Sequence, residues 1–62
     1  MNKPAALRVG EVARILGVHA HTVRNEIKRG RLRAFRAGRL MLVSRIALLE
    51  YMRDADDRVQ AT

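Results

Sequence analysis

The sequence has no cysteine, one proline and only two aromatic residues, Phe35 and Tyr51, both of which we expect to be buried. Without cysteine, neither a disulfide bond nor a thiolate metal site can stabilise the fold. Binding of single strands by stacking needs exposed aromatic side chains, so their scarcity argues against that mode. No apolar run approaches the roughly 18–20 residues that span a bilayer, and Arg8 follows the first residues too closely for a secretory signal. These absences predict a cytoplasmic protein with no membrane partner.

Acidic residues are scarce as well: the chain has six Asp and Glu residues and 13 Lys and Arg residues, which gives a formal net charge of +7. A chain of 62 residues makes one small domain, and such a domain buries only about 60% of its unfolded surface. We therefore expect its stability to be marginal. The positive charge favours a polyanionic partner, and the charge alone does not choose between nucleic acid and an anionic membrane.

The positive charge is concentrated in one run, in which Glu26 is the single acid. Seven basic residues make up this run: Arg24, Lys28, Arg29, Arg31, Arg33, Arg36 and Arg39. The run crosses a predicted helix, a turn and a hairpin. Charge that follows the elements of a fold indicates a surface for a phosphate backbone. A membrane-surface helix would instead carry its charge opposite a large apolar face of the same helix.

The first periodic segment predicts a helix over residues 10–16. Its apolar residues recur at helical spacing: Val9, Val12, Ala13 and Leu16. Gly17 stands where the C-terminal glycine of a helix belongs. Arg8 and Val9 offer no side-chain acceptor, so we expect the start of this helix to be poorly capped.

A second helix is predicted over residues 20–29, with Val23 and Ile27 on its buried face and Gly30 at its end. The two short helices are joined by a Gly17-Val18 turn. This is the helix-turn-helix arrangement, in which the second helix can lie in a DNA major groove.

Two short β-compatible segments follow, over residues 32–35 and 40–43, and Gly38 can supply the positive φ of a tight hairpin turn. Ser44 is a good N-cap for a third helix over residues 45–54. In that helix Leu48, Tyr51 and Met52 are expected to cover the core. Residues 1–6 are predicted to be a disordered lead, residues 7–54 the domain, and residues 55–62 a frayed acidic tail.

Several stretches together resemble the excisionase-type winged helix-turn-helix family, which is related to the DNA-binding head of MerR regulators. They are Leu7 to Val18, Thr22-Val23, Gly30-Arg31-Leu32, Ala34-Phe35-Arg36 and Gly38-Arg39. The resemblance covers about Leu7 to Met52. It implies a mainly α fold, a small winged helix-turn-helix with three helices and a short two-stranded hairpin wing. The chain departs from the family at Arg8 and His19, where Ser or Thr is usual before the first helix and Ser at the start of the second.

The resemblance also implies a mode of binding, in which the second helix enters the major groove and the wing reaches an adjacent minor groove or its phosphates. Free-standing members of this size are often phage or integrative-element excisionases. These recombination directionality factors bind and bend attachment-site DNA and direct an integrase toward excision. Other members regulate transcription, and the sequence leaves that alternative open.

The predicted DNA-binding residues of the second helix are those that fall away from Val23 and Ile27: His21, Thr22, Arg24, Asn25, Lys28 and Arg29. Arg pairs with guanine and Asn with adenine, so we expect Arg24 and Asn25 to read bases. Lys28 and Arg29 would anchor the backbone. In the turn and wing, the predicted DNA-binding residues are Arg31, Arg33, Arg36, Gly38 and Arg39.

An apolar surplus suggests a protein interface. Alternation in the hairpin and spacing in the third helix predict an outward patch made of Leu40, Leu42, Ile46 and Leu49. Such patches on small proteins often mark partner surfaces. The partner would be another protomer along the DNA or an integrase, although the same residues could instead enlarge a small core.

No catalytic, cofactor or metal site is expected. His19 and His21 do not share a helix face and fall short of a zinc site. No nucleophile–base pair is recognisable, because the chain has no cysteine and Ser44 is explained as a cap. The sequence therefore predicts a non-enzymatic protein that binds double-stranded DNA and has no small-molecule substrate. A non-specific basic protein that associates with RNA or membranes is a distant alternative.

Overall fold

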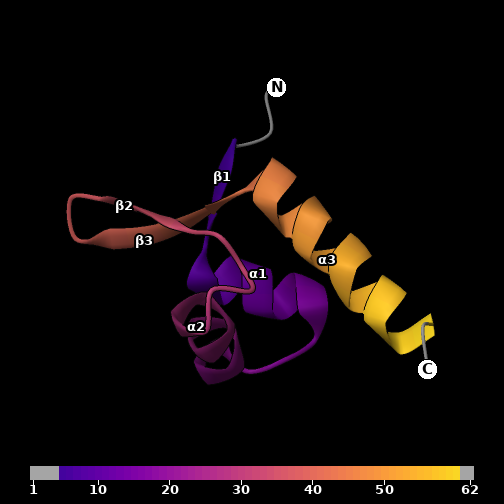
Figure 1. Ribbon diagram of the computed structural model, residues 1–62. Coiled ribbons are helices and arrows are strands. Elements are labelled where there is room, and N and C mark those ends of the chain that lie inside the picture. Colours follow the sequence, from indigo (N-terminus) through magenta and orange to yellow (C-terminus); the bar gives the residue numbers. More distant parts are fainter. Residues whose placement is uncertain (1–4, 61–62) are drawn as a thin grey trace.

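The computed structural model describes residues 5–60, which form three helices and three short strands. In chain order these are β1 (Ala6–Arg8), α1 (Val9–Leu16), α2 (Ala20–Lys28), β2 (Phe35–Ala37), β3 (Leu40–Ser44) and α3 (Arg45–Gln60). Helices α1 and α2 pack together, the β2–β3 hairpin extends to one side, and α3 runs along the other (Figure 1). The predicted mainly α fold, with three helices and a hairpin wing, is confirmed. No helix among these residues is long and apolar enough to cross a membrane.

The sheet has a third strand that the sequence did not reveal. Strand β1 pairs antiparallel with β3, in the order β1-β3-β2, and places Leu7 opposite Val43. Ala6 lies in this strand, and the Ala5 carbonyl accepts a hydrogen bond from the Arg45 N–H at 3.1 Å. The assignment of these two alanines to a disordered lead was therefore wrong, because a three-residue strand carries no periodic signal of its own. The remainder of that lead, residues 1–4, lies outside the described residues.

Helices α1 and α2 end in the same way, as their glycines predict. Gly17 has φ 71° and Gly30 has φ 79°, the left-handed conformation that glycine adopts without strain. After α2, the Gly30 N–H donates to the Ile27 carbonyl and the Arg31 N–H donates to the Glu26 carbonyl, both at 3.0 Å. This pair of bonds is a Schellman motif, and it fixes where α2 stops.

The start of α1 is poorly capped, as predicted. Its N-cap, Arg8, makes no side-chain cap hydrogen bond, because a guanidinium has no acceptor atom. The Arg8 backbone N–H does donate to Glu11 Oε1 at 2.9 Å, which is half of a capping box.

The hairpin is displaced from its predicted position. Its first strand is Phe35–Ala37, later than the predicted 32–35 segment, and Leu32 is a loop residue only 1% exposed. An apolar residue that anchors a loop to the core was thus mistaken for part of a strand. The register pairs Ala37 with Leu40, so Gly38 and Arg39 form a two-residue turn. Gly38 has φ 62° and Arg39 does not have positive φ, which is the type II′ pattern.

Helix α3 begins as predicted and continues beyond its predicted end. Ser44 Oγ accepts the Ala47 N–H at 3.0 Å, which confirms the N-cap. The helix extends to Gln60, so residues 55–60 of the expected frayed tail are helical, and residues 61–62 lie outside the described part of the chain. No glycine or proline follows Asp54 to stop the helix.

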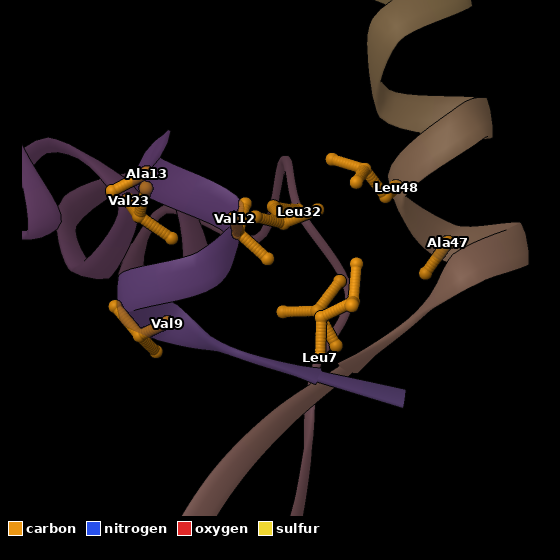
Figure 2. Close-up of a cluster of buried hydrophobic side chains, with 9 residues drawn as sticks. Leu7, Val9, Val12, Ala13, Val23, Leu32, Ala47 and Leu48 are labelled. Atoms are coloured by element: carbon orange, nitrogen blue, oxygen red, sulfur yellow. The ribbon is translucent and has the colours of Figure 1, made fainter. Parts of the chain in front are cut away.

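One small core joins β1, β3 and the three helices, and β2 contributes no buried side chain to it (Figure 2). Its buried side chains are Leu7, Val9, Val12, Ala13, Val23, Leu32, Val43, Ala47 and Leu48. Tyr51 packs at its edge, whereas Met52 is 42% exposed and its predicted core role is wrong. Because Val23 is the residue by which α2 is most deeply buried, the opposite face of α2 is left open.

Candidate nucleic-acid interface

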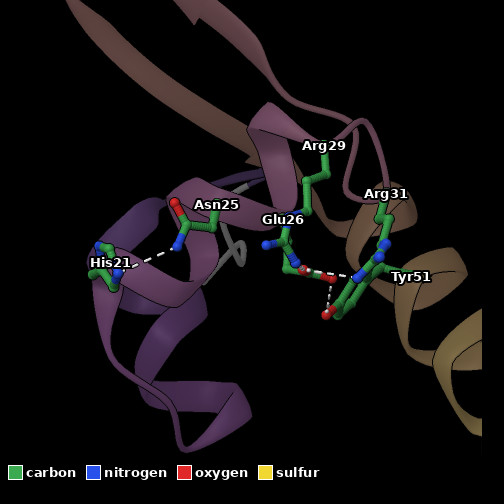
Figure 3. Close-up of polar contacts among 6 residues, drawn as sticks. All are labelled: His21, Asn25, Glu26, Arg29, Arg31 and Tyr51. Atoms are coloured by element: carbon green, nitrogen blue, oxygen red, sulfur yellow. Dashed lines mark hydrogen bonds and ion pairs between the residues drawn. The ribbon is translucent and has the colours of Figure 1, made fainter.

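The outward face of α2 presents an imidazole, an amide and an ammonium. His21, Asn25 and Lys28 lie one above another at helical spacing, opposite the buried Val23. The Asn25 amide nitrogen donates to His21 Nε2 at 3.2 Å (Figure 3). This bond leaves the Asn25 carbonyl oxygen and its second N–H available, which are the two groups that pair with adenine.

The other predicted residues of α2 lie at its two flanks. Thr22, although exposed, lies beside Leu16, Val18 and Tyr51, on the flank that faces α3. Arg24 lies on the opposite flank, toward β1 and the hairpin. Arg29 is the exposed C-cap residue of the helix. The six predicted residues therefore divide between an outward face and two edges.

Glu26, which the sequence analysis did not assign, connects α2 to α3. Its side chain is 12% exposed, accepts a hydrogen bond from the Tyr51 hydroxyl at 2.9 Å, and pairs with Arg31 at 3.3 Å (Figure 3). Arg29 lies 3.9 Å from the same carboxylate. Burial, and then the hydrogen bond to Glu26, raises the pKa of Tyr51. The sequence did mark Glu26 as the single acid in the basic run, but it did not show that Tyr51 of α3 would be its partner.

Two of the predicted turn residues are tied to acids of the same chain. Arg31 binds Glu26, and Arg33 Nη2 lies 2.6 Å from Glu50 Oε1 on α3. Arg31 is thus held at the end of α2, and Arg33 is held at α3. Their role in DNA binding stays a prediction, and these ion pairs reduce the charge that they present.

The wing places its basic residues on the side of α2. Arg36 pairs across the hairpin with Met41, and Met41 packs on the core beside Arg24, Ile27 and Lys28. Because paired residues share a face of the sheet, Arg36 lies on the face that turns toward α2. Arg39, next to Gly38 at the turn, borders the same depression as Arg24. Within residues 5–60, no ion pair involves Arg24, Lys28, Arg36 or Arg39.

Three of the four residues of the predicted apolar patch are exposed, and other exposed apolar residues lie nearby. Leu40, Ile46 and Leu49 are 43%, 68% and 63% exposed, whereas Leu42 is half-buried between Arg8 and Phe35. Phe35 is 47% exposed, so its predicted burial is wrong: it belongs to an edge strand and shares the outer sheet face with Leu42.

A second apolar surface lies between α1 and α3. We call it the α1–α3 groove, and its lining residues are Leu7, Ile15, Arg45, Leu48, Leu49 and Met52. Leu49 thus has Ile15 and Met52 as neighbours, and both of these are also exposed. Whether either surface binds a protein stays a prediction.

Comparison with known families agrees with this geometry. The sequence model of a family described as "Helix-turn-helix domain" matches residues 6–56, which is most of the chain. No curated protein and no solved structure matches significantly. The two short helices, the glycine-terminated turn between them and the basic outward face of the second helix lie within the matched residues. The chain therefore belongs to this helix-turn-helix domain family, which is excisionase-like, and is a DNA-binding protein.

Proposed function

We propose that the protein is a sequence-specific architectural factor for double-stranded DNA, and that it acts as a phage or integrative-element excisionase. The proposal of sequence specificity is supported by the outward face of α2. There the carbonyl oxygen and the second amide N–H of Asn25 are free beside His21 and Lys28. A purely electrostatic surface needs no amide at its centre. Amide and guanidinium side chains are the ones that distinguish base pairs in the major groove.

In this proposal α2 lies in the major groove and the wing in the adjacent minor groove, with Arg36 and Arg39 near its phosphates. Asn25 reads an adenine, while Lys28 and Arg29 contact the backbone. The protein needs no cofactor, metal or small-molecule substrate and is not an enzyme. Its place of action is the cytoplasm, where bacterial DNA and any phage DNA lie.

The architectural part of the proposal rests on the exposed apolar side chains. Ile46 and Leu49 belong to α3, which runs on the other side of the molecule from the hairpin (Figure 1). A protein bound through α2 and the wing therefore keeps an apolar surface free for a second protomer or for an integrase. A small transcriptional regulator with the same interface is the alternative, and the two differ in what lies beside the binding site.

The first test is binding to two fluorescent duplexes, one from the flanking genomic DNA and one scrambled, over a series of salt concentrations. We expect tighter binding to the genomic duplex, with several cooperative shifts. Equal binding to both duplexes, falling steeply with salt, would contradict base reading and leave only phosphate contacts.

A second experiment separates the two roles. Excision of an attachment-site cassette by the cognate integrase should depend on the protein and increase with its concentration. A circular-permutation assay should detect a bend in the same DNA. Repression of a neighbouring promoter, with no effect on excision, would favour the regulator instead.

A further inference from the structure

Three arginines from three separate elements line one open depression at the surface. Arg8 comes from the end of β1, Arg24 from α2 and Arg39 from the wing turn, and all three are exposed. We call this surface the arginine depression. The other residues that line it are Val9, Gly10, Leu40 and Met41, none of which is acidic.

The three guanidinium groups have no acidic partner among residues 5–60. Glu11, the acid nearest in sequence to Arg8, binds the Arg8 backbone N–H and so leaves the Arg8 side chain free. Positive charges gathered around one hollow repel each other, and an anion placed among them removes that repulsion. The arrangement is what a site for a single phosphate requires.

The position of the arginine depression fits one particular phosphate. The major and minor grooves of a duplex are separated by a sugar–phosphate strand. A protein with α2 in one groove and its wing in the next must straddle that strand. The residues between α2 and the wing then face it, and the arginine depression is bordered by Arg24 on one side and by Arg39 on the other.

We propose that Arg8, Arg24 and Arg39 together hold one backbone phosphate of the strand that crosses between α2 and the wing. The inference rests on the proposed placement of α2 and the wing on DNA. It assigns Arg24 to a phosphate instead of a base. It also gives a role to the Arg8 side chain, which makes no cap hydrogen bond at the start of α1.

The test uses the single variants R8Q, R24Q and R39Q and the triple variant R8Q/R24Q/R39Q, with R53Q as the matched control. Arg53 is an exposed arginine of α3, and its substitution removes the same charge away from the hairpin and α2. Each single variant should weaken binding by a similar factor on genomic and scrambled duplexes, while R53Q should not. Because R8Q keeps the backbone bond to Glu11, its melting curve should match that of the unmodified protein.

Sharing of one phosphate makes a quantitative prediction for the salt dependence. The slope of log K against log salt changes by about 0.9 for each phosphate that the protein no longer neutralises. The slope of the triple variant should therefore be shallower by about 1, because all three arginines serve one phosphate. A change of about 3 would mean three separate phosphates, and an unchanged slope would mean that none of the arginines binds one; either result overturns the proposal.

A scan with single methylphosphonates, which remove the charge of one phosphate at a time, locates the site. At one position the substitution should weaken binding of the unmodified protein, weaken binding of R8Q or R39Q by a smaller factor, and have no effect on the triple variant. Additive effects at every position would overturn the proposal, as would an altered base preference in R24Q. Failure of the unmodified protein to discriminate between the two duplexes would instead contradict the proposed specific function, and the salt slopes would still test the phosphate contact.

Discussion

At the scale of single residues, Glu26 and Glu50 make chemically similar ion pairs in different surroundings. The Glu26 side chain is 12% exposed and also accepts the Tyr51 hydroxyl, whereas Glu50 and its partner Arg33 are 52% and 73% exposed. An exposed pair contributes little because water and salt screen it. Removing the mostly buried Glu26 carboxylate leaves the part-buried Tyr51 hydroxyl without its acceptor, which costs more than the loss of an exposed pair. Glu26 should therefore hold α2 against α3, and Glu50 should not.

We expect E26A to lower the free energy of unfolding by about 2 kcal/mol and E50A by less than about 1 kcal/mol. Urea denaturation of the two variants measures both values. Since each substitution removes one carboxylate from an arginine partner, equal effects would show that burial of the Glu26 network contributes nothing.

Tyr51 provides a spectroscopic measure of the same contact, because it is the only tyrosine in the chain. Burial, and then Glu26, raises its pKa above the ordinary value for a tyrosine. A raised pKa in the folded state means stability that is present below the unfolded pKa and is lost as the pH rises through the folded pKa. Unfolding should thus become easier above about pH 10, and absorbance of the phenolate should show a lower pKa in E26Q than in the unmodified protein. No change in E26Q would leave burial as the whole cause.

Asn25 and Lys28 lie on the same outward face of α2 and should behave differently on DNA. N25A should relax the preference at one base pair, at a cost of about 1–3 kcal/mol there, because it removes a paired donor and acceptor. K28A should weaken binding to all sequences alike. Competition binding against a set of single-base variants measures both effects. A uniform weakening in N25A would mean that the amide contacts the backbone.

At the scale of elements, the ends of the helices follow from short-range chemistry. Gly17, Gly30 and Ser44 each act on a backbone group a few residues away, and each was correctly predicted from the sequence. Strand β1 was missed because it exists only through pairing with β3, which lies far away in the chain. The same reason explains part of the site: the basic run was evident, but Glu50, the partner of Arg33, lies on α3, and Tyr51, which donates to Glu26, lies there too.

Two glycines test the distinction between a left-handed position after a helix and a helical position in its first turn. Gly30 has φ 79°, whereas Gly10 lies inside α1 with ordinary helical geometry, and an added Cβ would meet nothing within 4 Å at either position. G30A should therefore destabilise the fold by about 1–2 kcal/mol through backbone strain alone. G10A should stabilise it by about 0.5–1 kcal/mol, because alanine favours helix. Thermal melts of the two variants should shift in opposite directions, and shifts of the same sign would contradict this account.

At the scale of the whole molecule, the DNA-facing elements and the apolar surface of α3 are separate. The hairpin lies on one side and α3 on the other (Figure 1). Leu49 is 63% exposed and borders the α1–α3 groove, whereas its neighbour Leu48 is 5% exposed. A charge at each of these two positions should therefore have different consequences.

We expect L49E to change the free energy of unfolding by no more than about 0.5 kcal/mol and to abolish cooperative binding to the genomic duplex. L48E, the matched buried control, should unfold the protein, because it places an unpaired charge in the core. Melting curves and titrations of multi-site duplexes distinguish the two. Unfolding of L49E would show that Leu49 belongs to the core, and unchanged cooperativity would remove it from the protomer contact.

The pairing of β1 with β3 also sets the order in which the molecule can assemble. Leu7 and Val43 are paired although the helix-turn-helix and most of the hairpin lie between them in the chain. Helices α1 and α2, in contrast, are neighbours along the chain and pack together. Closing the longer loop costs more chain entropy, so we expect the helix pair to form early and β1 to join late. The same strand should be among the first to detach in the native state. Backbone amides of β1 should then exchange their hydrogens with solvent faster than those of α2.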